Sequence, residues 1–196
     1  MDTKKIVNFI FELNQLKKQK RSSWGLAGID TPTSDADHIL RATQIGYILA
    51  VMEKNNNPEK IVTMLLIHDN GETRIGDQNK VSARYIDKKE GERNAFLEQI
   101  DGLGEIIENK WKQYFKEFEE RNSKEGIIAK DADWLETAFQ AKEYSDLGYP
   151  TQNWIDNVEK ALETESAKKL LQEMKNTRFT DWWKDLKKMT YTKIKK

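Results

Sequence analysis

The 196-residue sequence has no cysteine, which excludes a disulfide scaffold, a thiolate metal site and a cysteine nucleophile. Its 33 basic and 33 acidic side chains cancel, so no net charge draws the chain to nucleic acid or to a membrane surface. The longest aliphatic run, Met64 to Ile67, is far shorter than the ~18 residues of a membrane span. Asn8 and Glu12 interrupt any apolar stretch that could form a signal peptide. We therefore expect a soluble, cytoplasmic protein that binds neither nucleic acid nor membrane.

Proline and glycine are also scarce, at 3 and 10 residues. Apolar residues recur at the three-to-four spacing of amphipathic helices, as at Ile6, Phe9, Ile10 and Leu13. This spacing predicts an all-α helical bundle with helices over about 6–16, 35–52, 59–69, 89–101, 104–120, 123–147, 153–174 and 179–189, joined by irregular connections at 21–33 and 77–88.

The length suits one domain, since domains typically run roughly 100–200 residues, and neither an internal repeat nor a dividing linker is visible. We expect a single domain over 1–196, in which Ser34 or Asp35 caps the second helix. The helix at 59–69 is apolar on nearly all sides and is expected in the middle of the bundle.

Histidine is scarce as well, since His38 and His68 are the only two, and both are candidates for a functional site. His68 ends the most apolar helix and is followed by Asp69 and Glu72, which shares its face if the helix continues through Gly71. Burying such groups unpaired is costly, whereas a divalent cation satisfies imidazole and carboxylate together. The alternative reading is a core histidine that is satisfied by hydrogen bonds.

A second acidic segment, Lys130 to Glu136, lies inside the predicted helix at 123–147. Helical geometry places Asp133 nearest the apolar face, on the side that also carries Glu136, whereas Asp131 points elsewhere. Asp133 is therefore a further candidate ligand, and a solvated acidic stripe is the alternative reading.

Together these segments resemble the HD-domain metal-dependent phosphohydrolases, in particular their 5′-deoxynucleotidase branch. The resemblance covers about residues 8–150, before further helices at 151–190 and a basic tail at 191–196 that we expect to fray. The matching segments are Arg21-Ser22-Ser23-Trp24, Ser34 to His38, His68 to Glu72, Ile75-Gly76-Asp77, Ala132-Asp133 and Gln140 to Tyr144. Thr33, Ser23 and Asp35 depart from that branch, which usually has Glu, Gly and an apolar residue there; these positions fall in the loop that the resemblance implies faces the nucleotide.

The resemblance implies a helical HD-type fold that binds one divalent metal ion through His38, His68, Asp69 and Asp133. Two imidazoles and two carboxylates suit Mn²⁺, Co²⁺, Fe²⁺, Ni²⁺ or Mg²⁺, with Zn²⁺ possible. Four protein ligands leave about two coordination positions for water and a phosphate oxygen.

The resemblance also implies roles for the surrounding residues. Glu72 is the expected acid/base group, and Asp77 is expected to bind a sugar hydroxyl or assist the proton transfer. Arg21 is the candidate for binding phosphate, with Lys20 and Lys80 as weaker ones. Trp24 is expected to stack on the base or press on the sugar, although a loop tryptophan also suits the core.

We therefore expect an enzyme that converts deoxyribonucleoside 5′-monophosphates to nucleoside and phosphate. The alternatives are an HD phosphohydrolase that acts on a nucleoside triphosphate, a guanosine alarmone or another phosphate ester, and a non-catalytic helical nucleotide-sensing module. The resemblance further implies a homodimer. Its apolar surface could come from the C-terminal aromatic residues, which core packing explains equally well: Trp154, Phe179, Trp182 and Trp183.

Overall fold

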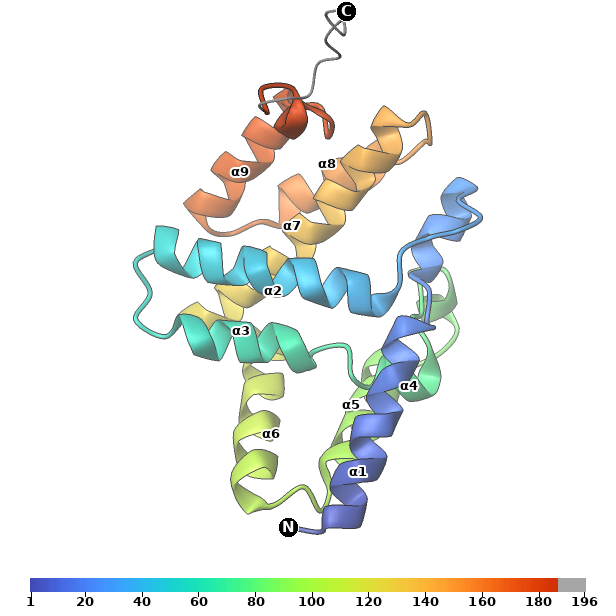
Figure 1. Cartoon of the computed structure of the whole chain (residues 1–196), viewed down its shortest axis with the longest axis vertical. Helices are drawn as coiled ribbons and strands as arrows, with labels where there is room; N and C mark the ends of the chain where they lie inside the picture. Colours follow the sequence, from blue (N-terminus) through green and yellow to red (C-terminus); the bar gives the residue numbers. More distant parts are fainter. Residues whose placement is uncertain (187–196) are drawn as a thin grey trace, which may run out of the picture.

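The computed structural model describes residues 1–186, and within them every regular element is helical (Figure 1). The predicted all-α fold is confirmed. The α-helices are α1 (Thr3–Glu12), α2 (Asp35–Met52), α3 (Pro58–Ile67), α4 (Glu72–Ile75), α5 (Lys88–Ile100), α6 (Glu105–Glu120), α7 (Lys124–Asp146), α8 (Gln152–Ala161) and α9 (Glu165–Asn176).

The long helix α7 lies at the centre and packs against α2, α3, α6, α8 and α9. Ser123 begins it by accepting the Gly126 N–H at 3.0 Å, as expected of an N-cap serine. Ala132 and Ala138 on α7 are fully buried, so their small side chains let neighbouring helices approach closely. This close approach brings α2 and α3 against the same stretch of α7.

Two apolar clusters stabilise the bundle. The larger one joins α2, α3, α7, α8 and α9, and the smaller one joins α1, α5 and α6 to the end of α3. In the smaller cluster, Phe96 and Phe115 stack with ring centroids 4.5 Å apart. Phe118 of the larger cluster lies 4.9 Å from the His68 ring, so His68 follows α3 at the junction between the clusters.

The single helix predicted over 153–174 is wrong, because α8 ends at Ala161 and α9 begins at Glu165. Asp131 of α7 causes the break: its carboxylate accepts the backbone N–H groups of Glu163 and Thr164, at 3.0 and 2.7 Å. Thr164 then caps α9. Asp131 thus points away from the histidines, as predicted.

Three smaller expectations also need correction. The first α-helix ends at Glu12 and continues as a 3₁₀ helix over Leu13–Lys17, and Ile10 on it is 60% exposed rather than buried. The connection at 21–33 contains a 3₁₀ helix, Ser22–Ala27. Within 179–186, the described part of the helix predicted at 179–189, there is a 3₁₀ turn, Asp181–Trp183. Residues 187–196, with the predicted basic tail, lie outside the described part.

The helix α3 is less enclosed than its composition suggests. Ile61, Met64 and Leu65 are fully buried, but Leu66 is 52% exposed. Within residues 1–186, no helix has the length and apolar character that crossing a membrane requires.

Substitution of Gly126 by alanine should destabilise the fold. A Cβ atom there would overlap the backbone carbonyl oxygen of Glu117, which belongs to α6 and has little freedom to move. We expect Gly126→Ala to lower the free energy of unfolding by about 1–3 kcal/mol in urea denaturation. Gly25→Ala is the matched control, because nothing lies within 4 Å of its added Cβ. Equal effects of the two substitutions would contradict the close α6–α7 contact.

Candidate metal centre

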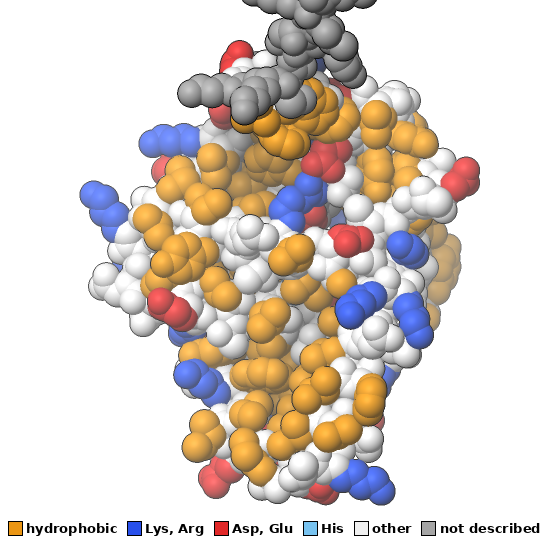
Figure 2. Space-filling model, viewed as in Figure 1, with side chains coloured by type: hydrophobic (Ala, Val, Ile, Leu, Met, Phe, Trp, Pro, Cys, Tyr) orange, Lys and Arg blue, Asp and Glu red, His pale blue; other side chains and the backbone are white. Residues whose placement is uncertain are grey.

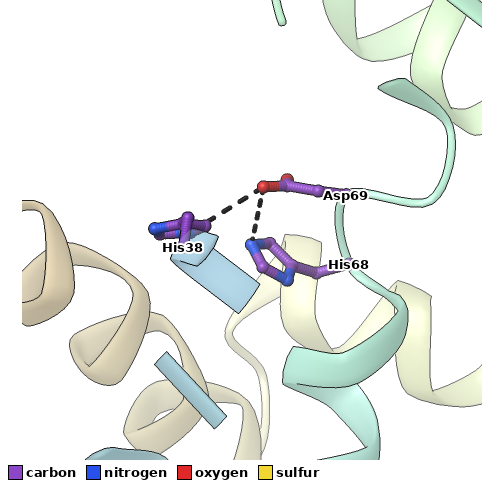
Figure 3. Close-up of side chains that lie close together, drawn as sticks. All are labelled: His38, His68 and Asp69. Atoms are coloured by element: carbon purple, nitrogen blue, oxygen red, sulfur yellow. Dashed lines mark ion pairs between the residues drawn. The ribbon is translucent and has the colours of Figure 1, made fainter. Parts of the chain in front are cut away.

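Both histidines and Asp69 converge in space (Figure 3). His38 lies in the first turn of α2, whereas His68 and Asp69 directly follow α3. Asp69 Oδ2 lies 3.1 Å from His68 Nε2 and 3.8 Å from His38 Nε2. The three ligand atoms all lie within 4.8 Å of one another, so one cation can contact them together.

Asp133 completes the group from α7. Its Oδ1 atom lies 3.1 Å from His38 Nε2 and 3.8 Å from His68 Nε2, and its Oδ2 atom lies 3.1 Å from Lys130 Nζ. The structure therefore brings together the four residues expected as metal ligands, from α2, the end of α3 and α7.

Hydrogen bonding shows that these residues fit a metal ion. His68 Nδ1 is 2.7 Å from the backbone oxygen of Leu65, and His38 Nδ1 is hydrogen-bonded to Glu136. Both Nε2 atoms are buried and make no hydrogen bond. A neutral imidazole that donates from Nδ1 presents its Nε2 lone pair, and metal-binding histidines are usually held in this way by a partner. Two such nitrogens beside two carboxylates are a donor set for a divalent cation.

The electrostatic environment keeps the two candidate carboxylates ionised. Burial alone raises the pKa of Asp69, but His68 and Arg21 outweigh burial and hold that pKa far below its usual range. Burial acts likewise on Asp133, where Lys130 and the histidines lower the pKa. For His38, burial opposes protonation, yet Glu136 and Asp133 raise the pKa to about 9. The carboxylates thus attract any positive charge placed between the rings.

Glu72 lies beside this group but not on the same helix as His68. The condition for a shared helix face is not met, because α3 ends at Ile67, close to the predicted end at 69, and α4 begins at Glu72. The Glu72 side chain is 1% exposed, and burial and Asp69 raise its pKa well above the usual range. Its Oε2 atom makes no hydrogen bond. A buried carboxyl group with a raised pKa is suited to donate or accept a proton at a functional site.

Two cations flank Glu72. Arg21 Nη1 lies 2.9 Å from Asp69 Oδ2 and 3.7 Å from Glu72 Oε2, and Lys88 Nζ lies 3.3 Å from Glu72 Oε1. Asp77 is placed here as well, because its Oδ1 atom is 3.7 Å from Lys88 Nζ and its Oδ2 atom accepts the Ser22 N–H at 2.6 Å. Asp77 therefore anchors the loop that carries Arg21.

Trp24 is buried among aromatic side chains. The residue is 3% exposed, with its ring 5.2 Å from Tyr144 and 5.5 Å from Trp154. The tryptophan belongs to the larger apolar cluster, since burying its ring there removes more apolar surface from water than a place in an open site. The structure thus places Trp24 in the core, the alternative that its loop position left open, and contact with a substrate stays a prediction. Lys20 and Lys80 are exposed.

Sequence reasoning missed Lys88 and the burial of Asp35. Lys88 lies in the charged segment 87–93, whose composition resembles a solvated helix end. Asp35 is 0% exposed, with its carboxylate 4.0 Å from Arg21, and burial raises its pKa to about 6. The sequence shows that Asp35 replaces the apolar residue usual in the related branch, but it does not show that Arg21 lies beside it.

The fold and the site match a known family. The model of the HD domain matches residues 13–178, and the chain belongs to that family. Among the relatives is the 5′-deoxynucleotidase HDDC2 of Dictyostelium discoideum, which is 30% identical over 150 residues, or 72% of this chain and 78% of that protein. The protein of the same name from Danio rerio is 29% identical over 147 residues, covering 72% and 70%.

The fold is also similar to that of solved structures. A conserved hypothetical protein from Pyrococcus furiosus matches with a TM-score of 0.73 at 26% identity, covering 87% of this chain and 99% of that one. The resemblance to the HD family that the His, His-Asp and Asp motifs carry is thereby confirmed.

Metal binding should stabilise the protein through Asp133. A cation at one hundred times its dissociation constant, bound to the folded state alone, stabilises that state by about 2.7 kcal/mol. We expect Mn²⁺ to raise the melting temperature of the wild-type protein and not that of Asp133→Asn. Asp131→Asn is the control: loss of its contacts with the start of α9 lowers the melting temperature, but the Mn²⁺ shift remains. A full shift in Asp133→Asn would remove Asp133 from the ligands.

Proposed function

We propose that the chain is a divalent-metal-dependent 5′-deoxynucleotidase that hydrolyses deoxyribonucleoside 5′-monophosphates. The observation that carries this proposal is the pair of buried histidine Nε2 atoms without hydrogen bonds, which face the ionised Asp69 and Asp133. Membership of the HD family and the names of the relatives support the reaction class and the substrate.

The proposed ligands are His38, His68, Asp69 and Asp133. A divalent cation held there supplies an acidified water and an electrophilic phosphate. Glu72 is the proposed acid/base group, which exchanges a proton with the reacting water or with the 5′ oxygen that leaves as the phosphorus–oxygen bond breaks. Its raised pKa supports this role, because the carboxyl group can then hold the proton that it passes on.

Arg21 is the proposed phosphate-binding residue. Its guanidinium group lies against Asp69 and Glu72, which places a fixed positive charge beside the proposed ion. Arginine suits this role since it offers a planar pair of donors to phosphate oxygens. Asp77 supports the position of Arg21 through Ser22, and its second oxygen is proposed to accept a sugar hydroxyl.

The substrate proposal is tested by a panel of phosphate esters assayed for released phosphate. With Mn²⁺ present, we expect deoxyribonucleoside 5′-monophosphates to be hydrolysed faster than ribonucleotides, because a pocket closed against the 2′ carbon excludes a hydroxyl. A preference for triphosphates or guanosine alarmones would instead assign the chain to another substrate within the family. An absence of hydrolysis by the metal-loaded protein would favour a nucleotide-sensing module.

Glu72→Gln should separate catalysis from metal binding. We expect it to retain the metal, measured by elemental analysis, while kcat falls by about 10²-fold or more, since the amide does not carry the proton. Glu90→Gln, on the exposed start of α5, is the control and should leave kcat unchanged. Turnover unaffected by Glu72→Gln would exclude Glu72 from the mechanism.

A homodimer is proposed as well, formed through the face of α1, α2 and α3. Apolar side chains gather on the surface in this view (Figure 2). The exposed apolar side chains of these helices include Ile10 and Phe11 of α1, Ile48 of α2 and Leu66 of α3, which are 60%, 73%, 51% and 52% exposed. Exposed apolar surface of this kind is typical of protein interfaces. Of the C-terminal aromatic residues, Trp154 packs against the larger cluster, which leaves mainly Trp182 exposed.

The oligomeric state can be tested by a charge on this face. We expect Ile48→Glu to convert the dimer to a monomer in sedimentation velocity, because a buried unpaired carboxylate opposes association. Leu147→Glu, at a position that is also more than half exposed and lies beyond the end of α7, is the control and should remain dimeric. A wild-type protein that sediments as a monomer would refute this proposal without affecting the enzymatic one.

A further inference from the structure

Glu136 connects the candidate metal centre to a polar network between α2 and α7. Its side chain is 5% exposed, and its Oε2 atom is hydrogen-bonded to His38 Nδ1. Its Oε1 atom accepts two hydrogen bonds from Arg41, from Nε at 3.0 Å and from Nη2 at 2.7 Å. Both carboxylate oxygens are therefore engaged, each by a different residue of α2.

We propose that Glu136 is a positioning residue that fixes the tautomer and orientation of His38. The inference rests on the proposed metal site, in which His38 Nε2 is a ligand. An ionised carboxylate only accepts hydrogen bonds, so its partner nitrogen, Nδ1, must carry the proton. The lone pair of His38 is thereby assigned to Nε2, the atom that lies 3.1 Å from Asp133 Oδ1.

Arg41 keeps Glu136 in this position. The remaining donors of its guanidinium group contact Gln140 Oε1 at 2.9 Å and Glu143 Oε1 at 2.5 Å. These acceptors lie on the same face of α7 as Glu136, since residues three and four apart on a helix are neighbours. Rotation of Glu136 away from His38 would break both of its bonds to Arg41.

The two histidines are oriented by different means. His68 Nδ1 is bonded to the Leu65 carbonyl group within its own segment, so the backbone of α3 sets its orientation. His38 has no such local partner and depends on a side chain from α7. The geometry of the metal centre is thus sensitive to a single substitution at Glu136, a residue that contacts neither the proposed ion nor the substrate.

Glu136→Gln tests the assignment, because the amide reverses the hydrogen bond. The amide oxygen is needed as acceptor for Arg41, so its NH₂ group faces His38 Nδ1 and shifts the ring proton to Nε2. We expect the affinity for Mn²⁺, measured by calorimetry on the metal-free protein, to fall by about 10- to 100-fold. Glu143→Gln is the control, since Glu143 contacts Arg41 but not His38, and its affinity should equal that of the wild-type protein.

The ring proton can be observed directly, because selective ¹⁵N-histidine labelling gives only two imidazoles. In the neutral His38 imidazole of the wild-type protein, NMR should show the proton on Nδ1, the nitrogen that is hydrogen-bonded to Glu136. A proton on His38 Nε2 in the wild-type protein would overturn the proposal even if Glu136→Gln does not fold, as would unchanged Mn²⁺ affinity in that variant. Full metal affinity in His38→Ala would instead refute the proposed metal site itself.

Discussion

The burial of ionisable groups where three helices meet is the constraint on which the rest of the structure depends. Imidazoles and carboxylates lose hydration there, and this cost is offset only when charges and hydrogen-bond partners are brought to them. Close packing of the helices brings these partners together. Gly46 on α2 is an example, because a Cβ atom there would overlap the Leu65 side chain of α3. The missing side chain lets the helices that carry His38 and precede His68 lie against each other.

The polar side chains around the two histidines form two sets, which differ in the elements that carry them. On one side, His38, Glu136 and Arg41 connect α2 to α7, held by hydrogen bonds between side chains. On the other side, Glu72 and Lys88 come from the shorter helices that follow α3, and they meet the loop that carries Arg21. The contacts between α2 and α7 thus lie on one side of the histidines, and the loop and short helices with Arg21, Glu72 and Lys88 lie next to Asp69.

Most of the fold was predictable from the sequence, since apolar spacing is a local property of each helix. The cap at Ser34 and the separation of Asp133 from Asp131 follow from helix geometry alone. The division of 153–174 was not predictable, because it depends on Asp131, a residue distant in sequence. Lys88 was missed for the same reason, because the contacts of a charged helix end with Glu72 and Asp77 depend on the tertiary structure.

The hydrogen bond from Ser22 to Asp77 has a consequence for how the chain can vary in length. It joins two loops that are 55 positions apart, so the eight steps from Asp69 to Asp77 must span a set distance between the metal centre and the loop. Insertions or deletions within those steps would displace one end or the other. Lys88 contacts Asp77 and Glu72 again, so the largely exposed stretch 79–85 between Asp77 and Lys88 is where we expect a change of length to be tolerated.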